Sequence, residues 1–240
     1  MMPRGSRATQ LHRRQAIVIS DMPNSLNALP LDHVILAIDS LDRGIDRLAE
    51  MTGVSAQMGG AHPGRGTRNA LLGLGDDQYL ELIAPNPADA SPPLRPGPFD
   101  EQVDFTRFGS LTPIGWVVRV LDADAERDRL IERGLSPGPV HVGERARADG
   151  RVLRWKTFDP FGFRAAVLPF AISWGEDTPH PSASAPVGCT LGALRLERPD
   201  ADVIRDMLTR AGWPVPVSSA PSERIEVLLR CPRGSVMLPL

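Results

Sequence analysis

The chain has 240 residues, of which 42% are hydrophobic, and this composition is typical of a soluble globular protein that can bury a sizeable core. Its 27 basic and 29 acidic residues leave a formal net charge of −2, so no strong electrostatic field favours nucleic acid or a membrane surface as a partner. The longest apolar runs are about six residues, well short of the roughly 20 that span a bilayer.

Residues 1–29 contain the arginine pair Arg13-Arg14, followed by the short apolar run AIVI. This run is shorter than the roughly 7–15 residues in the apolar core of an export signal, and Asp21 interrupts the segment after it. We therefore interpret residues 1–29 as a disordered leader or as the result of an over-extended start codon, and we expect the protein to be cytoplasmic.

Residues 30–87 are predicted to form one β-α-β-β-β unit. LDHVILAI is almost entirely apolar, which is typical of a strand covered on both faces. The next segment, residues 39–53, has apolar residues at helical spacing, a capping Asp or Ser at its start and a glycine at its end. Three further strands are indicated by VSAQMG, TRNALLGLG and QYLELIA, with Gly, Pro and Asp in the turns.

The same order repeats in residues 111–172. IGWVVRVL predicts the first strand and DADAERDRLIERG the helix. The remaining strands are predicted at PGPVHVGE, RVLRWKTF and FRAAVLPF. Aligning the closing strands of the two units by their prolines places Pro85 over Pro169, which makes Ala165 the equivalent of Glu81.

Residues 188–240 contain a third, shorter round, which we interpret as a partial β-α-β module. GALRLERP and DADVIRDMLTRAG predict its first strand and helix, and VPVSS, RIEVLLRCP and SVMLPL indicate the short strands that follow. This segment either builds a homodimer interface or seals the end of the barrel. Its two cysteines, Cys189 and Cys231, are too few for a disulfide scaffold and are not spaced as a metal clip.

Three segments, LDHVILAIDSLDRGIDRLAEMTG, TRNALLGLGDDQYLELIAPNP and LPFAISWGEDTPHP, carry a resemblance to a known family. In them the chain resembles the vicinal oxygen chelate (glyoxalase/bleomycin resistance/dioxygenase) superfamily, and within it the glyoxalase-like domain proteins. The resemblance covers residues 30–180 and extends loosely to the rest. It implies an α+β fold in which tandem βαβββ modules form a cupped, half-closed barrel with outer helices. It also implies a small-molecule ligand in the cup and one divalent metal, held by the first and last strands of each module.

Strand alternation gives an independent prediction of the site. His33 and Glu81 each occupy the face of their strand opposite the purely aliphatic one, so both are expected to point into the cup. An ionised glutamate between Leu80 and Leu82 is costly unless it is paired, hydrated or metal-bound. Imidazole and carboxylate suit Zn, Fe, Mn or Ni. We predict His33 and Glu81 as metal ligands and Glu81 as the catalytic base, with a hydrogen-bonded core pair as the alternative.

The second module weakens the metal prediction. The equivalents of His33 and Glu81 there are predicted to be Trp116 and Ala165, and neither side chain binds metal. Only two of four ligand positions are then filled, whereas protein metal sites normally have at least three protein ligands. Further ligands would have to come from His62, His141 or His180.

Five residues are predicted to contact a substrate. His62 lies in a Gly-rich bend and Asn69 beside it, although His62 also suits an ordinary hairpin tip. Trp116 and Arg154 would supply an aromatic wall and a cation for a planar or carboxylate ligand, with burial in the core as the alternative for Trp116. His180 follows the second module and is placed at the rim of the cup, although the prolines after it suit a linker equally well.

Two functions remain open at this point. With a metal, the protein is a lyase, isomerase or dioxygenase of the glyoxalase type, in which the ion polarises a carbonyl and Glu81 moves a proton. Without a metal, it is a non-catalytic small-molecule binding or resistance protein, which Trp116 and Ala165 favour. No residue pattern names the substrate.

Overall fold

The computed structural model describes residues 29–239, apart from residues 76, 147–149, 151 and 164. The predicted leader therefore falls, except for Leu29, outside the described residues. The first module consists of β1 (Leu31–Ala37), α1 (Leu41–Thr52), β2 (Gln57–His62), β3 (Thr67–Gly75) and β4 (Gln78–Pro85). The second consists of β5 (Thr112–Arg119), α2 (Ala123–Glu132), β6 (His141–Ala146), β7 (Val152–Phe158) and β8 (Phe170–Trp174).

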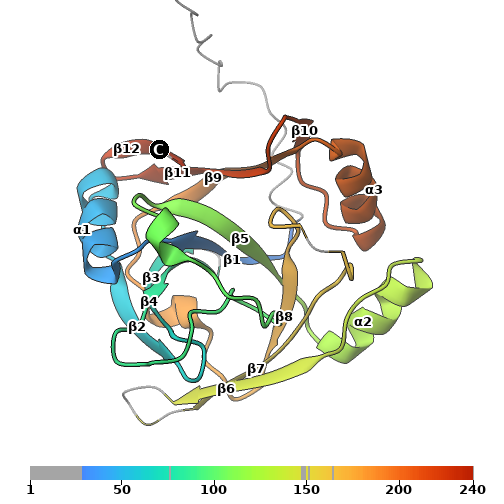
Figure 1. The fold of residues 1–240 in the computed structure, drawn as a ribbon, viewed down its shortest axis with the longest axis horizontal. Coiled ribbons are helices and arrows are strands. Elements are labelled where there is room, and N and C mark those ends of the chain that lie inside the picture. Colours follow the sequence, from blue (N-terminus) through green and yellow to red (C-terminus); the bar gives the residue numbers. More distant parts are fainter. Residues whose placement is uncertain (1–28, 76, 147–149, 151, 164, 240) are drawn as a thin grey trace, which may run out of the picture.

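These two modules form one eight-stranded sheet in the order β2-β3-β4-β1-β5-β8-β7-β6. β1 pairs in parallel with β4 and antiparallel with β5, so the modules meet along their first strands. The sheet curves around a hollow, with α1 and α2 outside it (Figure 1). This architecture confirms the predicted α+β fold of tandem βαβββ modules in a cupped barrel.

The third segment consists of β9 (Thr190–Arg198), α3 (Ala201–Ala211), β10 (Val217–Ser219), β11 (Arg224–Cys231) and β12 (Gly234–Leu238). Its last three strands fall in the predicted segments VPVSS, RIEVLLRCP and SVMLPL, and it forms a separate sheet in the order β10-β9-β11-β12. Its first strand lies between a parallel and an antiparallel neighbour from its own module. In the first module, by contrast, β1 pairs with only one strand of its own module, β4.

The third segment packs on the outer face of the larger sheet. Buried Leu194, Leu196 and Val227 belong to the same hydrophobic cluster as Val34 and Leu36 of β1. In Figure 1 its strands lie beside β5 and β1, on the side away from the hollow. The segment therefore shares the core of the first two modules and supports the strands that carry the site.

A disulfide joins Cys189 to Cys231, 42 positions apart. It links the start of β9 to the end of β11. Two cysteines are too few for a scaffold of several bonds, and the sequence pattern did not indicate that they would pair.

The closing strand of the second module lies further along the chain than predicted. Residues 163–170 are predicted as that strand, but β8 begins at Phe170, and a turn occupies residues 166–167. Pro169 thus precedes its strand, a position that proline tolerates because it has no N–H to donate to the ladder. The alignment of Pro85 with Pro169, and with it the equivalence of Ala165 to Glu81, is wrong.

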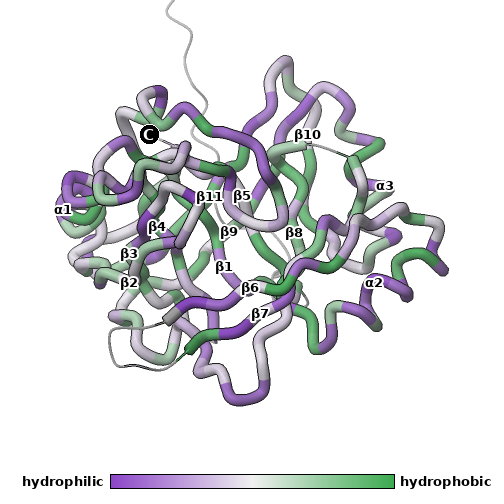
Figure 2. The backbone as a smooth tube through the Cα atoms, turned by 60° about the horizontal axis from the view of Figure 1, so that its bottom comes forward, coloured by the Kyte–Doolittle hydropathy of each residue, from purple (hydrophilic) through white to green (hydrophobic). Residues whose placement is uncertain are grey.

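The large sheet has two hydrophobic faces. The outer face packs against the helices and the third segment, whereas a smaller cluster lies on the inner face. The inner cluster comprises Ile35, Ala37, Ile83, Phe105, Val117, Phe170 and Ile172. Figure 2 shows β6, at the edge of the sheet, as largely hydrophilic. Among the described residues, no helix has both the length and the apolar character needed to cross a membrane.

Candidate functional site

The inner face of the sheet surrounds a cavity of about 490 Å³. The two modules contribute different chemistry to its lining. Module one supplies a polar group of side chains: His33, His62, Thr67, Asn69, Tyr79 and Glu81. Module two supplies an apolar wall on β7 and β8, with Leu153, Trp155, Phe170, Ile172 and Trp174, and polar side chains on β6, with His141, Glu144 and Arg145.

An irregularity in β1 brings Asp32 and His33 together. The pairing of β1 with β5 shifts register between Leu31 and His33. Neighbouring side chains in a regular strand point to opposite faces, but a bulge can redirect one of them. Here Asp32 Oδ1 lies 2.6 Å from His33 Nδ1. Sequence alternation placed Asp32 on the far face, so the prediction of the site missed it.

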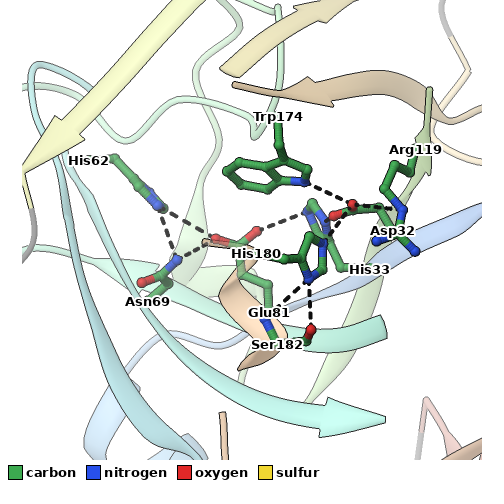
Figure 3. Close-up of polar contacts among 9 residues, drawn as sticks. All are labelled: Asp32, His33, His62, Asn69, Glu81, Arg119, Trp174, His180 and Ser182. Carbon is green, nitrogen blue, oxygen red and sulfur yellow. Dashed lines mark hydrogen bonds and ion pairs between the residues drawn. The ribbon is translucent and has the colours of Figure 1, made fainter. Parts of the chain in front are cut away.

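Asp32 is fully buried and is the centre of a polar network (Figure 3). Its Oδ2 accepts a hydrogen bond from Trp174 Nε1 at 2.9 Å and lies 3.0 Å from His180 Nε2. Burial alone would raise the pKa of this carboxyl group. The hydrogen bonds and charges of His180 and His33 outweigh burial and hold the pKa below its usual range.

Glu81 lies between the polar residues of β1 and those of β2 and β3. Its Oε2 is 3.5 Å from His33 Nε2, and its Oε1 accepts a hydrogen bond from Asn69 Nδ2 at 2.6 Å. His62 Nε2 is 3.5 Å from the same Oε1. Burial would raise the pKa of Glu81, but His33, with help from His62 and Asn69, lowers it to about 2. Glu81 is therefore ionised at neutral pH.

His33 completes a line of three ionisable groups. Burial alone would lower its pKa, but hydrogen bonds and charges from Asp32 and Glu81 raise it to about 9. At neutral pH its ring is thus an imidazolium between two carboxylates. The ring also stacks on Tyr79, with 4.5 Å between the ring centroids. Figure 3 shows this chain of contacts running from His62 through Glu81 and His33 to Asp32.

His62 is neutral in this network. Its Nε2 lies 3.2 Å from Asn69 Nδ2, an amide nitrogen that can only donate, so Nε2 is the acceptor. Its Nδ1 then carries the proton and donates to Thr67 Oγ1 at 2.9 Å. We infer this tautomer from the hydrogen-bond partners. Burial lowers the pKa of His62, and Arg145 and Arg65 add to this effect against the opposing charge of Glu81.

These residues do not fit the divalent metal that the resemblance implies. His33 holds Asp32 through Nδ1 and presents Nε2 to Glu81 as a proton donor, so the ring has no lone pair to offer. Glu81 keeps acceptor capacity, but a single carboxylate falls short of the three protein ligands that metal sites normally have. Within the described ranges, no group of three or more His, Cys, Asp or Glu side chains is arranged to hold a metal ion. We therefore derive no chemical step through a metal.

The predicted positions of Trp116 and Arg154 are wrong. Trp116 pairs with Val34 of β1 and shares its outer face, where it is fully buried and donates from Nε1 to Val167 O at 2.7 Å. The Arg154 side chain is 63% exposed and lies 3.6 Å from Glu144. Its neighbour Trp155, on the opposite face of β7, lines the cavity instead.

The remaining predicted residues lie at different depths around the cavity. His62 and Asn69 line it, as does the exposed His141 of β6. His180 does not belong to the lining, since its ring packs against Tyr79 and Trp174 and its Nε2 lies 3.0 Å from Asp32 Oδ2. It therefore supports the site from outside the cup and does not form its rim.

The connector between β4 and β5, residues 86–111, forms part of the cavity wall. Leu94, Pro96, Gly97, Pro98 and Asp100 all line the cavity. Arg65, in the turn after β2, holds this segment by donating to the carbonyl oxygens of Arg95 at 2.5 Å and Phe99 at 2.6 Å. Hydrogen bonds from Arg65 therefore hold the connector in place as one wall of the cavity.

The chain is similar in sequence to one protein family and in structure to several solved proteins. A sequence model described as a glyoxalase-like domain matches residues 31–212. A hypothetical protein from Staphylococcus aureus has a similar structure, with a TM-score of 0.58 and 15% identity over 86% of this chain and 83% of that one. At this identity the likeness shows the fold alone. No curated protein matches the sequence significantly.

Two methylmalonyl-CoA epimerase structures are similar at a lower level. The enzyme from Mycobacterium tuberculosis gives a TM-score of 0.43 and 21% identity, covering 69% of this chain and 99% of that one. The Streptomyces coelicolor enzyme, a variant in complex with 2-nitronate-propionyl-CoA, gives 0.41 and 18%, covering 61% and 97%. Neither likeness carries an argument about the activity of this chain.

Proposed function

Because this chain belongs to the glyoxalase-like domain family of the vicinal oxygen chelate superfamily, we propose that it binds a small organic molecule in the cavity of its cupped sheet. Glu81 anchors the polar end of that molecule. Asn69 and His62 border the same part of the cavity. In this proposed function the protein is a binding or resistance protein, and it needs no metal to bind the molecule.

The observation that carries the proposal is an ionised, buried carboxylate on the wall of a cavity. The Glu81 side chain is only 10% exposed, and it lines a space of about 490 Å³. Cavities of roughly 300–1,000 Å³ with a few convergent polar groups are typical of small-molecule sites. A carboxylate offers about four acceptor positions, so His33 and Asn69 leave capacity for a ligand.

A thermal-shift screen of a small-molecule fragment library tests this function. We expect ligands that raise the melting temperature of the wild type to have at most a tenth of their affinity for Glu81→Gln, which keeps the shape of the side chain and removes its charge. Glu50→Gln is the matched control, because the Glu50 side chain is 67% exposed on α1. Ligands that bind Glu81→Gln as well as the wild type, or a library without a single ligand, would contradict the proposal.

A second candidate function is proton transfer on the bound molecule, as in an isomerase or lyase. It is favoured by the line of ionisable groups Asp32, His33 and Glu81, which reaches from the interior to the cavity. Glu81 would take a proton from the ligand and return it. A carboxylate with a pKa near 2 is a weaker base than one tuned toward neutral pH, and therefore binding is the leading proposal.

Solvent exchange separates the two functions. A ligand found in the screen is incubated with the protein in D₂O and analysed by mass spectrometry. Deuterium incorporated at carbon with the wild type and lost with Glu81→Gln supports proton transfer. Binding without exchange supports the binding function alone. Whichever of the two functions holds, the homodimer and the cytoplasmic location stay predictions from the sequence.

A further inference from the structure

The cavity wall opposite Glu81 is aromatic. Trp155 of β7 and Trp174 of β8 are direct partners across the two strands, with ring centroids 5.9 Å apart and planes at 60°. Phe170 occupies the same face of β8, four positions before Trp174. Both tryptophans are half-buried, so each ring presents surface to the cavity.

Glycines and one hydrogen bond hold these rings in place. Trp174 is held by the bond from its Nε1 to Asp32. Trp155 lies against Gly143 of β6, where an added Cβ would come within 2.4 Å of its Nε1. Phe170 lies against Gly97 of the connector, where a Cβ would come within 2.6 Å of the ring. The wall is therefore pre-organised, which reduces the entropy lost when a flat molecule binds against it.

The polar end of the cavity presents the Glu81 carboxylate as a hydrogen-bond acceptor, beside two arginines. Glu81 is an acceptor on both oxygens, and His62 uses Nε2 to accept from Asn69. Two arginines also line the cavity, and both donate to protein acceptors. Arg65 donates to two carbonyl oxygens of the connector, and Arg145 donates to Asn69 Oδ1 at 3.3 Å. A negatively charged ligand group next to Glu81 would meet a like charge.

Resting on the proposed binding function, we propose that the ligand is a planar aromatic or heteroaromatic molecule with a neutral hydrogen-bond donor at one end. The donor, a hydroxyl or ring N–H, meets the Glu81 carboxylate. The flat body lies against Trp155 and Trp174, where offset or edge-to-face contacts between rings are favourable. Such a ligand contacts the carboxylate of the first module with its donor and the aromatic wall of the second module with its flat body.

Calorimetric titration with three matched bicyclic probes tests the ligand class. The probes are 2-naphthol, which is flat and donates; 2-naphthoate, which is flat and anionic; and decahydro-2-naphthol, which donates but is not flat. We expect 2-naphthol to bind at least tenfold more tightly than either of the others. Equal or tighter binding of 2-naphthoate overturns the donor requirement, and equal binding of decahydro-2-naphthol overturns the aromatic one.

Variants next to and at Trp155 test whether its ring contacts the bound 2-naphthol. Gly143→Ala forces the Trp155 ring away from β6, and we expect it to weaken 2-naphthol binding at least fivefold. Gly109→Ala is the control, because a Cβ at Gly109 would meet no atom within 4 Å. Trp155→Leu should remove the preference for 2-naphthol over decahydro-2-naphthol. An unchanged preference in Trp155→Leu overturns the role of the wall.

The failure of this ligand class is distinguishable from the failure of the binding function. If 2-naphthol does not bind but the fragment screen yields Glu81-dependent ligands that are not aromatic donors, the class is wrong and the function stands. If no fragment and none of the three probes binds, both are wrong.

Discussion

Asp32 and Trp174 are 142 positions apart in the chain, and the indole Nε1 of Trp174 donates a 2.9 Å hydrogen bond to the Asp32 carboxylate. This bond joins the first strand of module one to the last strand of module two. The bond holds two groups in place: the Asp32 carboxylate, which orients His33, and the Trp174 ring, which is part of the aromatic wall. The two halves of the cavity are therefore set by a common contact.

Removing this bond should destabilise the protein. Trp174→Phe keeps an aromatic ring and deletes the donor to a buried carboxylate, so we expect the free energy of unfolding to fall by about 1.5–3 kcal/mol. Trp155→Phe is the control, since the Trp155 N–H makes no hydrogen bond within the described part of the chain. Denaturant unfolding measures both. Equal losses in the two variants would show that the bond to Asp32 contributes nothing specific.

The paired imidazolium predicts a pH dependence of stability. The pKa of His33 is about 9 in the folded protein against 6.5 for an unperturbed histidine, so the unfolded state releases its proton first. The stabilisation is therefore fully present below pH 6.5 and is lost as the pH rises through 9. The difference in melting temperature between wild type and His33→Gln should shrink between pH 6 and pH 10. A difference that does not change with pH would contradict the ion pair.

Metal analysis distinguishes the hydrogen-bonded His33–Glu81 pair from a metal centre. Protein purified without a histidine tag should contain far less than one equivalent of Zn, Fe, Mn or Ni, with no difference between wild type and His33→Ala. The physical reason is that the protonated His33 ring has no lone pair to offer, which leaves Glu81 with too few partner ligands for a metal ion. One equivalent of metal in the wild type that disappears in His33→Ala would overturn this view of the site.

The disulfide should stabilise the fold without affecting the cup. Closing a 42-residue loop reduces the entropy of the unfolded chain, so Cys189→Ser/Cys231→Ser should lose up to roughly 4 kcal/mol of unfolding free energy. Among the described residues, none beyond Pro181 lines the cavity, so ligand affinity should stay within about twofold. Guanidinium unfolding and calorimetry check the two statements. A large loss of affinity would show that the third segment shapes the site.

The sequence was sufficient to predict the modules and the meeting of His33 with Glu81. Repetition of the β-α-β-β-β order and strand alternation carry this information directly. Alternation also led to the errors. It could not reveal the register shift before His33 that turns Asp32 inward, because a bulge depends on how β1 pairs with β5. It assigned Trp116 to the cup for the same reason, since the register of β5 on β1 decides which face that residue occupies.

The closing strand of module two shows another limit. FRAAVLPF and FAISW are both apolar runs of strand length, and the sequence does not say which one joins the sheet. Pairing with β5 selects the second, since Phe170 lies opposite Val117. That choice puts Phe170, Ile172 and Trp174 in the cavity, so the aromatic wall is formed by other residues than the predicted Trp116.

The division of the cavity lining between two copies of one module has a consequence for how such a protein can diverge. The carboxylate and its partners lie on β1 to β4, whereas the aromatic wall lies on β7 and β8. Substitutions on β7 and β8 can therefore change which molecular shape fits while Glu81 keeps its surroundings. Substitutions in the first copy can change the chemistry offered to an unchanged shape. A duplicated fold of this kind can acquire new ligands and new reactivity by separate evolutionary steps, coupled through the bonds from Trp174 to Asp32 and from Arg145 to Asn69.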